Sequence, residues 1–215
     1  MLAGFYLVVG VLGILSMGFQ LLASRLLNPH FGSDLIVWAW LISTFLAAFS
    51  TGSMLGGWIS RFPAPRRSRI QLVTAAIGVA SLALTAIEGQ PQRLFGEGSP
   101  HPFLSWLELA TEQRNLQLLA ACVGLFFFPV TALSSFGPQC VQFLATRGTA
   151  PGAASGTVYA VSTIGNIAGV MLTALALIPN FRVSQLLTGW LVVAVVGLGC
   201  LIVILRSASS SPSAS

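Results

Sequence analysis

The sequence predicts an all-α polytopic membrane protein whose single domain crosses the lipid bilayer six times. Three observations carry this prediction: only 7% of the 215 residues are charged, 55% are hydrophobic, and mean hydropathy is +0.87. A soluble domain carries roughly 25% charged residues, so lipid rather than water must cover most of this surface. The apolar runs reach the roughly 20 residues of a membrane helix and lack the alternation of a β-barrel strand.

The expected helices are separated by proline-containing turns and charged loops. Asn28-Pro29 ends the first span and Pro179-Asn180 ends the fifth, while Pro129 and Pro138 should kink the fourth. Residues 1–206 are therefore expected to form one transmembrane domain, and the serine-rich residues 207–215 a disordered tail. The six spans are expected at about residues 4–27, 35–59, 71–87, 116–144, 156–178 and 184–205.

The distribution of arginine predicts the topology. The loop after the second span is the most basic segment of the chain, and it carries Arg61, Arg66, Arg67 and Arg69. Because positively charged loops stay on the cytoplasmic side, both termini should be cytoplasmic and all five acidic residues should lie outside. We expect a location in the bacterial inner (cytoplasmic) membrane. The basic character then orients the protein in lipid, and no nucleic-acid partner is expected.

The outer loop, residues 88–114, contains a segment with helical periodicity at 102–113. Phe103, Trp106, Leu107 and Ala110 would share one face of this helix, with the acidic side chains on another. That pattern is typical of a helix lying in the membrane interface. A loop that simply packs over the helix ends remains an open alternative.

Pairs of glycines four residues apart predict close contacts between helices. Glycine lets two helix backbones approach each other in lipid, although the spacing does not identify the partner helix. The glycines expected at such contacts are Gly52, Gly56 and Gly57 in the second span, and Gly152, Gly156, Gly165 and Gly169 around the fifth.

The sequence carries none of the residue constellations that soluble enzymes use. It has no paired carboxylates, no cluster of metal ligands, and no nucleophile with a plausible base. Cys122, Cys140 and Cys200 lie in or near apolar helices without paired spacing, as small buried hydrophobic residues do. We therefore expect no catalytic residue, no metal and no cofactor.

Polar side chains inside the apolar spans are the candidates for a functional site. Gln20 and Arg25 lie on the outer half of the first span, and Tyr159 and Asn166 lie on the fifth. Because polar groups are expensive in lipid, these side chains should face the bundle or a water-filled cavity, where they would line a substrate pathway. The alternative is hydrogen bonding between helices, worth about 0.6 kcal/mol on average.

These two interpretations are weighed differently for each residue. Hydrogen bonding between helices is favoured for Tyr159, for Ser162 on the same span, and for the glutamines, which include Gln139 and Gln142 at the inner end of the fourth span. The two interpretations are balanced for Asn166. For Arg25 we favour a side chain that reaches the outer headgroups or pairs with Asp34 over a role in substrate binding.

Two segments give the chain a resemblance to a known family. Residues 19–62 contain PHFGS at 29–33 and GGWISR at 56–61, and residues 154–187 contain GTVYAVSTIG followed by an Ile-Pro turn. Both segments resemble the membrane half of fused MFS/spermidine synthase-like proteins. The resemblance implies a six-helix bundle similar to half of a major-facilitator transporter.

The chain also departs from that family. Ser60 stands where the superfamily signature between its second and third spans has an acid. Fused members continue into an aminopropyltransferase domain, which is not found after Arg206, so the resemblance implies a protein that is not an enzyme.

Two functions follow from these expectations. The first is a half-size transporter-like module of the inner membrane that acts as a homodimer, with an unknown substrate. The second is a non-transporting anchor or scaffold subunit for a separately encoded synthase-like enzyme or a larger membrane complex. The lipid bilayer is a partner in both, together with a second copy or another membrane or cytoplasmic subunit. Buried polar residues favour the transporter-like module, whereas the lack of an acid at mid-membrane weighs against proton coupling.

Overall fold

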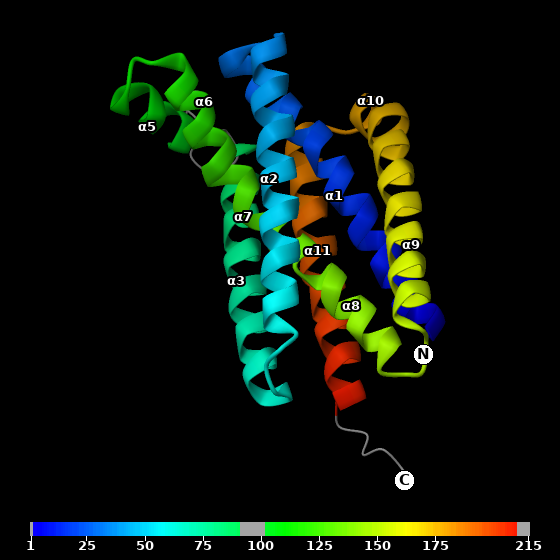
Figure 1. Cartoon of the computed structure of the whole chain (residues 1–215). Helices are drawn as coiled ribbons and strands as arrows, with labels where there is room; N and C mark the ends of the chain where they lie inside the picture. The colour runs from blue at the N-terminus through cyan, green and yellow to red at the C-terminus, as the bar shows by residue number, and fades with distance from the viewer. Residues whose placement is uncertain (1, 91–101, 210–215) are drawn as a thin grey trace.

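The protein is a bundle of helices that pass back and forth between two ends (Figure 1). The computed structural model describes residues 2–90 and 102–209, and every regular element within them is helical. Six helical segments in these residues are long and apolar enough to cross a membrane, as the sequence predicts. They are α1 (Leu2–Phe31), α2 (Leu35–Ile59), α3 (Ala64–Glu88), the compound fourth and fifth spans (Arg114–Ala145 and Pro151–Asn180), and α11 (Val183–Ser209).

The fourth and fifth spans change helix type in front of their prolines. The fourth consists of α6 (Arg114–Cys122), η1 (Val123–Phe127), α7 (Phe128–Ser134) and α8 (Phe136–Ala145). The fifth consists of α9 (Pro151–Leu172), η2 (Thr173–Leu177) and α10 (Ile178–Asn180). Proline has no N–H to donate to the carbonyl four residues earlier, and such positions commonly widen into a π-helical turn.

Hydroxyl groups from α3 satisfy the carbonyls that the fourth span leaves open. Pro129 cannot donate to the Leu125 carbonyl, and Thr85 Oγ1 donates to that oxygen at 2.8 Å instead. Ser81 Oγ donates to the neighbouring Gly124 carbonyl at 3.1 Å. Backbone groups inside a bilayer must be paired within the protein, so these two bonds allow the irregular turn to exist at this depth.

The packing of the bundle brings the first and last described helices to the same end. α1 runs along α9 and also contacts α11, α11 contacts α3, and α2 lies against α7 and α8. The start of α1 and the end of α11 lie at the same end of the bundle as the α2–α3 and α8–α9 loops (Figure 1). We call this the basic end, because it carries the exposed Arg61, Arg66 and Arg69 and the partly buried Arg67.

At the basic end, amide side chains tie α3 to α8. Gln71 donates to Gln139 in a buried hydrogen bond between the two helices. Arg67 donates to Gln142 Oε1 at 3.3 Å, and Gln142 in turn donates to the Ser60 carbonyl at 3.2 Å. Gln139 and Gln142 therefore form hydrogen bonds between segments of the bundle, as the sequence interpretation favours for them, and Gln71 supplies one of the partners.

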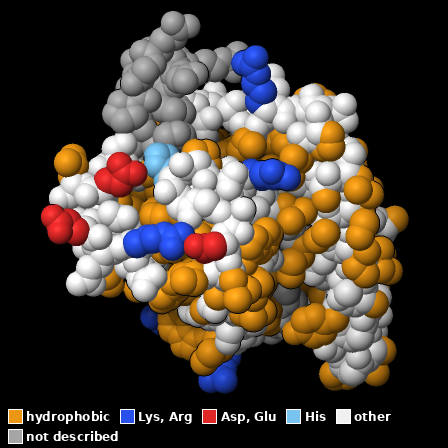
Figure 2. All heavy atoms as spheres, turned by 90° about the horizontal axis from the view of Figure 1, so that it is seen from above, with side chains coloured by type: hydrophobic (Ala, Val, Ile, Leu, Met, Phe, Trp, Pro, Cys, Tyr) orange, Lys and Arg blue, Asp and Glu red, His pale blue; other side chains and the backbone are white. Residues whose placement is uncertain are grey.

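The opposite end, which we call the acidic end, carries every acidic side chain that the structure describes. Viewed onto this end, charged side chains gather on the exposed face and hydrophobic side chains spread down the flanks (Figure 2). Such a division, with polar ends and apolar sides, suits a protein that contacts a lipid bilayer around its girth. The acidic residues described are Asp34, Glu88, Glu108 and Glu112.

Four of the predicted glycines make close helix contacts. A Cβ added at Gly165 would lie 3.2 Å from Gly10 Cα, and one at Gly169 would lie 2.7 Å from Ile14 Cα, both on α1. A Cβ at Gly56 would lie 2.8 Å from the Ser135 carbonyl carbon, and Gly52 faces Ser134 and the Thr131 carbonyl. Two interfaces, α1 with α9 and α2 with the α7–α8 junction, therefore depend on glycine.

The other three predicted glycines do not make such contacts. Gly57, Gly152 and Gly156 have no described atom within 4 Å of the position a Cβ would take. Gly57 lies one residue past the contact face of α2. The two glycines at the start of α9 are exposed, whereas Ala154 between them is the buried residue that faces the bundle. The small-residue spacing alone could not separate these positions from the other four.

Helix bounds differ from the predicted ones mainly at the ends. α3 begins at Ala64 and not near residue 71, because Pro63 and Pro65 suit a helix start and the arginine segment continues the helix beyond the apolar core. α11 extends through Ser209, three residues into the expected tail, and residues 210–215 lie outside the described part of the chain.

The outer segment contains a short helix, α5 (Pro102–Ala110). Its buried residues are Leu104 and Leu107, while Trp106 and Leu109 are 59% and 88% exposed. The predicted face that grouped Trp106 with Leu107 is therefore divided. α5 packs on the bundle with one face and presents large apolar side chains with another, as an interfacial helix would.

An ion pair joins the α1–α2 turn to the start of α6. Arg114 Nη2 lies 2.6 Å from Asp34 Oδ2 and 2.7 Å from the Phe31 carbonyl. Asp34 also accepts from the Val37 N–H at 2.9 Å and so caps α2. The predicted alternative of a pair between Arg25 and Asp34 is thus wrong: the partner of Asp34 is Arg114. The Arg114 hydrogen bond, followed by that of Val37, holds the pKa of Asp34 below its ordinary value of 3.8.

We expect the Asp34 contribution to stability to disappear in acid. A carboxylate whose pKa is lowered by folding stabilises the fold above its unfolded pKa, and this stabilisation is lost as pH falls through the folded pKa. Asp34→Asn keeps a good capping side chain and removes the charge. The difference in unfolding temperature between the wild type and this variant should be constant from about pH 8 to pH 5 and shrink below about pH 4. An undiminished difference at about pH 3 would contradict this assignment.

Candidate functional site

A cavity with polar lining residues lies between four spans, from the level of Asn166 toward the basic end, and we call it the central cavity. It has a volume of about 250 Å³ and is lined by residues of the first, second, fourth and fifth spans. Most of its walls are apolar, with hydroxyl and amide groups placed among them, which is the usual composition of a small-molecule site. Its polar lining residues are Ser16, Ser53, Ser134, Tyr159, Ser162, Thr163 and Asn166.

A polar stripe on α9 supplies most of these groups. Tyr159, Ser162, Thr163 and Asn166 follow the spacing i, i+3, i+4, i+7, which places them on one face of the helix. The predicted residues Tyr159 and Asn166 therefore meet in one cavity. Thr163 was not among the predicted residues, although the helical spacing of this stripe would have identified it.

Asn166 lies at the centre of the fifth span. It is 15 residues from Pro151 and 14 from Asn180, the two ends of that span. Its Oδ1 atom is buried and has no hydrogen-bond partner among the described residues. A buried polar atom without a partner costs about 1–3 kcal/mol, so a donor from a bound molecule or a water would satisfy it.

The close contact between α1 and α9 fixes the position of Asn166. A Cβ added at Gly13 would lie 3.2 Å from the Asn166 backbone nitrogen. Glycine is required at Gly13 and Gly165 because any side chain there would separate the two helices. The backbone of α9 beside the cavity is therefore positioned by its close contact with α1.

Within residues 2–90 and 102–209, no helix covers the remaining side of the central cavity. The fifth span is the least buried of the six described spans. In its 18-residue apolar stretch 17% of the residues are buried, against 50% in the fourth span. Tyr159 is 57% exposed and Ile164 is 67% exposed. Apolar side chains such as Ile164 suit lipid, but the hydroxyl and amide groups of the stripe do not.

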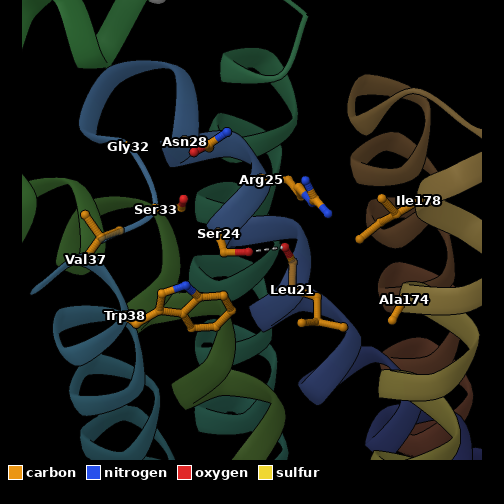
Figure 3. Close-up of a pocket in the computed structure, with 10 residues that line it drawn as sticks. All are labelled: Leu21, Ser24, Arg25, Asn28, Gly32, Ser33, Val37, Trp38, Ala174 and Ile178. Carbon is orange, nitrogen blue, oxygen red and sulfur yellow. Dashed lines mark hydrogen bonds between the residues drawn. The ribbon is translucent and has the colours of Figure 1, made fainter. Parts of the chain in front are cut away.

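Arg25 lies in a different pocket. This Arg25 pocket has a volume of about 300 Å³ and lies near the acidic end, between α1, the start of α2 and the end of the fifth span. Figure 3 shows the Arg25 guanidinium extending from α1 toward Ile178. The predicted pathway therefore divides into two separate sites, and Gln20, which is half-buried, lines neither of them.

Neither a search for a metal site nor comparison with known proteins indicates a chemistry for this chain. In residues 2–90 and 102–209, no three His, Cys, Asp or Glu side chains lie close enough to hold a metal ion together. The chain matches no protein-family model, no curated protein and no solved structure. The protein is an integral membrane protein with six candidate spans, and its function must be argued from its own cavities.

Proposed function

We propose that the protein is a half-size transporter-like module that works as a homodimer and carries a small polar solute. The observation that supports this proposal is the central cavity, whose polar lining extends from Asn166, at the centre of the fifth span, toward the basic end, and whose remaining side is not covered by a described helix. Asn166, with its buried and unpartnered amide oxygen, is the residue assigned to bind the solute.

A second copy would supply the missing wall. Transporters often place their substrate site near the membrane midplane between two related bundles. If two copies face each other across α9, the exposed Tyr159 and Thr163 leave the lipid and line a shared cavity of about twice the volume. The apolar residues that flank the stripe, among them Ile164 and Ile167, would then pack between the copies.

The lining of the cavity indicates the class of solute. None of its lining residues is charged, and its polar groups are hydroxyls and one amide that donate and accept hydrogen bonds. Such a lining suits a neutral polar molecule better than a polycation, which would require carboxylates to bind tightly. We therefore propose an uncharged, hydroxyl- or amide-bearing solute, transported without a catalytic step in this chain.

The family resemblance and the topology belong to the same proposal. The motifs at 29–33 and 56–61 support a relationship to the membrane half of MFS/spermidine synthase-like proteins. The clustered arginines support a location in the bacterial inner membrane, with the basic end and both termini in the cytoplasm. Labelling of a cysteine introduced at position 66 by an impermeant reagent from outside intact cells would overturn this orientation.

The proposal is tested by uptake into vesicles that contain the purified full chain. A uniformly ¹³C-labelled extract of polar metabolites serves as the probe, and mass spectrometry identifies the labelled solutes that accumulate. We expect at least one neutral polar solute to accumulate above the level in protein-free vesicles. Identical profiles with and without protein would contradict transport. Stoichiometric recovery of another protein from native membranes would then favour the anchor or scaffold role.

A further inference from the structure

The Arg25 pocket contains a cation that has no counter-ion among residues 2–90 and 102–209. Arg25 forms no hydrogen bond or ion pair with the described residues, and no acidic side chain is among those that line the pocket. Asp34, three residues before the pocket residue Val37, is engaged by Arg114 at 2.6 Å. Glu108, on α5, lies 3.3 Å from His30. The nearby carboxylates are thus positioned toward other groups.

The depth of Arg25 makes a free cation unfavourable. It lies six residues before the end of α1, which corresponds to about 9 Å along the helix axis. At that distance from the helix end, an arginine side chain reaches the boundary between hydrocarbon and headgroups, where a charge needs an anionic partner or water. The guanidinium extends across the pocket toward Ile178 and the end of the fifth span (Figure 3).

Further donors surround the same pocket. The Asn28 amide and the Ser33 hydroxyl line it, and neither side chain bonds to a described residue. Gly32, with φ of 75°, makes the turn that brings Ser33 back toward α1. The other lining residues include Trp38, Ala174 and Ile178, which form an apolar wall.

We propose that the Arg25 pocket binds a phosphate group attached to an apolar or glycerol-like body. A guanidinium fork matches phosphate oxygens, and the Asn28 and Ser33 donors suit a group with more acceptor oxygens than a carboxylate has. The apolar wall accommodates the rest of the molecule. The ligand is either a phospholipid headgroup or a soluble phosphate ester, and both share this chemistry. This inference does not depend on the proposed transport function, because the pocket is separate from the central cavity.

The test is native mass spectrometry of the full chain in detergent, titrated with phosphatidylglycerol or glycerol 3-phosphate. We expect Arg25→Gln to weaken binding by about tenfold, as loss of one charge-assisted contact would. The control is Arg182→Gln, which removes an exposed arginine at the same end that does not line the pocket, and it should change binding by less than about twofold.

A second variant guards against a general folding defect. Ala174→Phe keeps the arginine and fills the pocket, so it should also lose binding while its unfolding temperature stays near that of the wild type. Displacement of the lipid by glycerol 3-phosphate would assign the site to soluble phosphate esters, and lipid binding without displacement would assign it to headgroups. Equal binding by the wild type, Arg25→Gln and Ala174→Phe for both probes would overturn the proposal.

Discussion

Replacing Gly56 with leucine is expected to destabilise the protein by about 3 kcal/mol. A Cβ at this position would lie 2.8 Å from the Ser135 carbonyl carbon and 3.1 Å from Ser135 Cα, and these backbone atoms cannot rotate away. The helix propensity of leucine exceeds that of glycine by nearly 1 kcal/mol, so a loss of stability must come from the contact between α2 and the α7–α8 junction. Unfolding of the purified protein in mixed micelles measures the effect.

The matched control is Gly57→Leu, one residue further along the same helix. No described atom lies within 4 Å of a Cβ at Gly57, so this variant should be at least as stable as the wild type and gain up to about 1 kcal/mol from the helix propensity of leucine. Equal unfolding midpoints for the two leucine variants would show that α2 does not pack against Ser135 as described.

Replacing Asn166 with leucine is expected to lower solute uptake by at least about tenfold without lowering stability. Loss of one hydrogen bond together with the added bulk of leucine in the central cavity accounts for an effect of this size. Because the Oδ1 atom has no partner in the described residues, removing it relieves an unsatisfied group, and the unfolding midpoint should stay equal or rise. Vesicle uptake and micelle unfolding, measured on the same preparation, test both halves of this prediction.

Gln20→Leu provides the comparison for Asn166. It removes an amide from a membrane span that lies outside both described pockets, so uptake should stay within about twofold of the wild type. A parallel loss of uptake in both variants would mean that polar groups act through the bundle as a whole. A parallel loss of uptake and stability in Asn166→Leu would reduce its role to packing.

Helix identity could be predicted from the sequence because it depends on local properties. Length and hydropathy suffice to identify an element such as α11, and the lack of an N–H at Pro129 predicts an irregularity in the fourth span. The starting point of α3 was missed because hydropathy marks the apolar core of a helix and not its polar extension beyond the lipid. Pro65 carried the signal for the true start.

Helix partners could not be predicted in the same way. The spacing of Gly165 and Gly169 indicates a contact, but the partner backbone at Gly10 lies more than 150 positions earlier in the chain. Asp34 likewise pairs with Arg114, 80 residues away, and not with the nearby Arg25. Such pairings follow from the arrangement of the helices, which no local pattern specifies.

The candidate site likewise combines residues that local spacing identifies with residues that only the fold brings together. The stripe from Tyr159 to Asn166 follows helical spacing and could be found within one span. Ser16 and Ser134 join the cavity from other spans, and nothing in their local sequence distinguishes them from serines that bond to their own helix. The separation of Arg25 from Asn166 required the structure.

The distance between two copies in native-lipid nanodiscs tests the central claim most directly, namely that a second copy closes the central cavity. In a variant without its native cysteines, a spin label is attached to a cysteine introduced in place of Ile164, beside the cavity, or in place of Val73, which is 58% exposed on α3. Packed helices have axes 8–10 Å apart, so the account predicts an inter-copy distance within about 20 Å for residue 164 and beyond about 40 Å for residue 73. The absence of any inter-copy distance at residue 164, or a shorter one at residue 73, would contradict it.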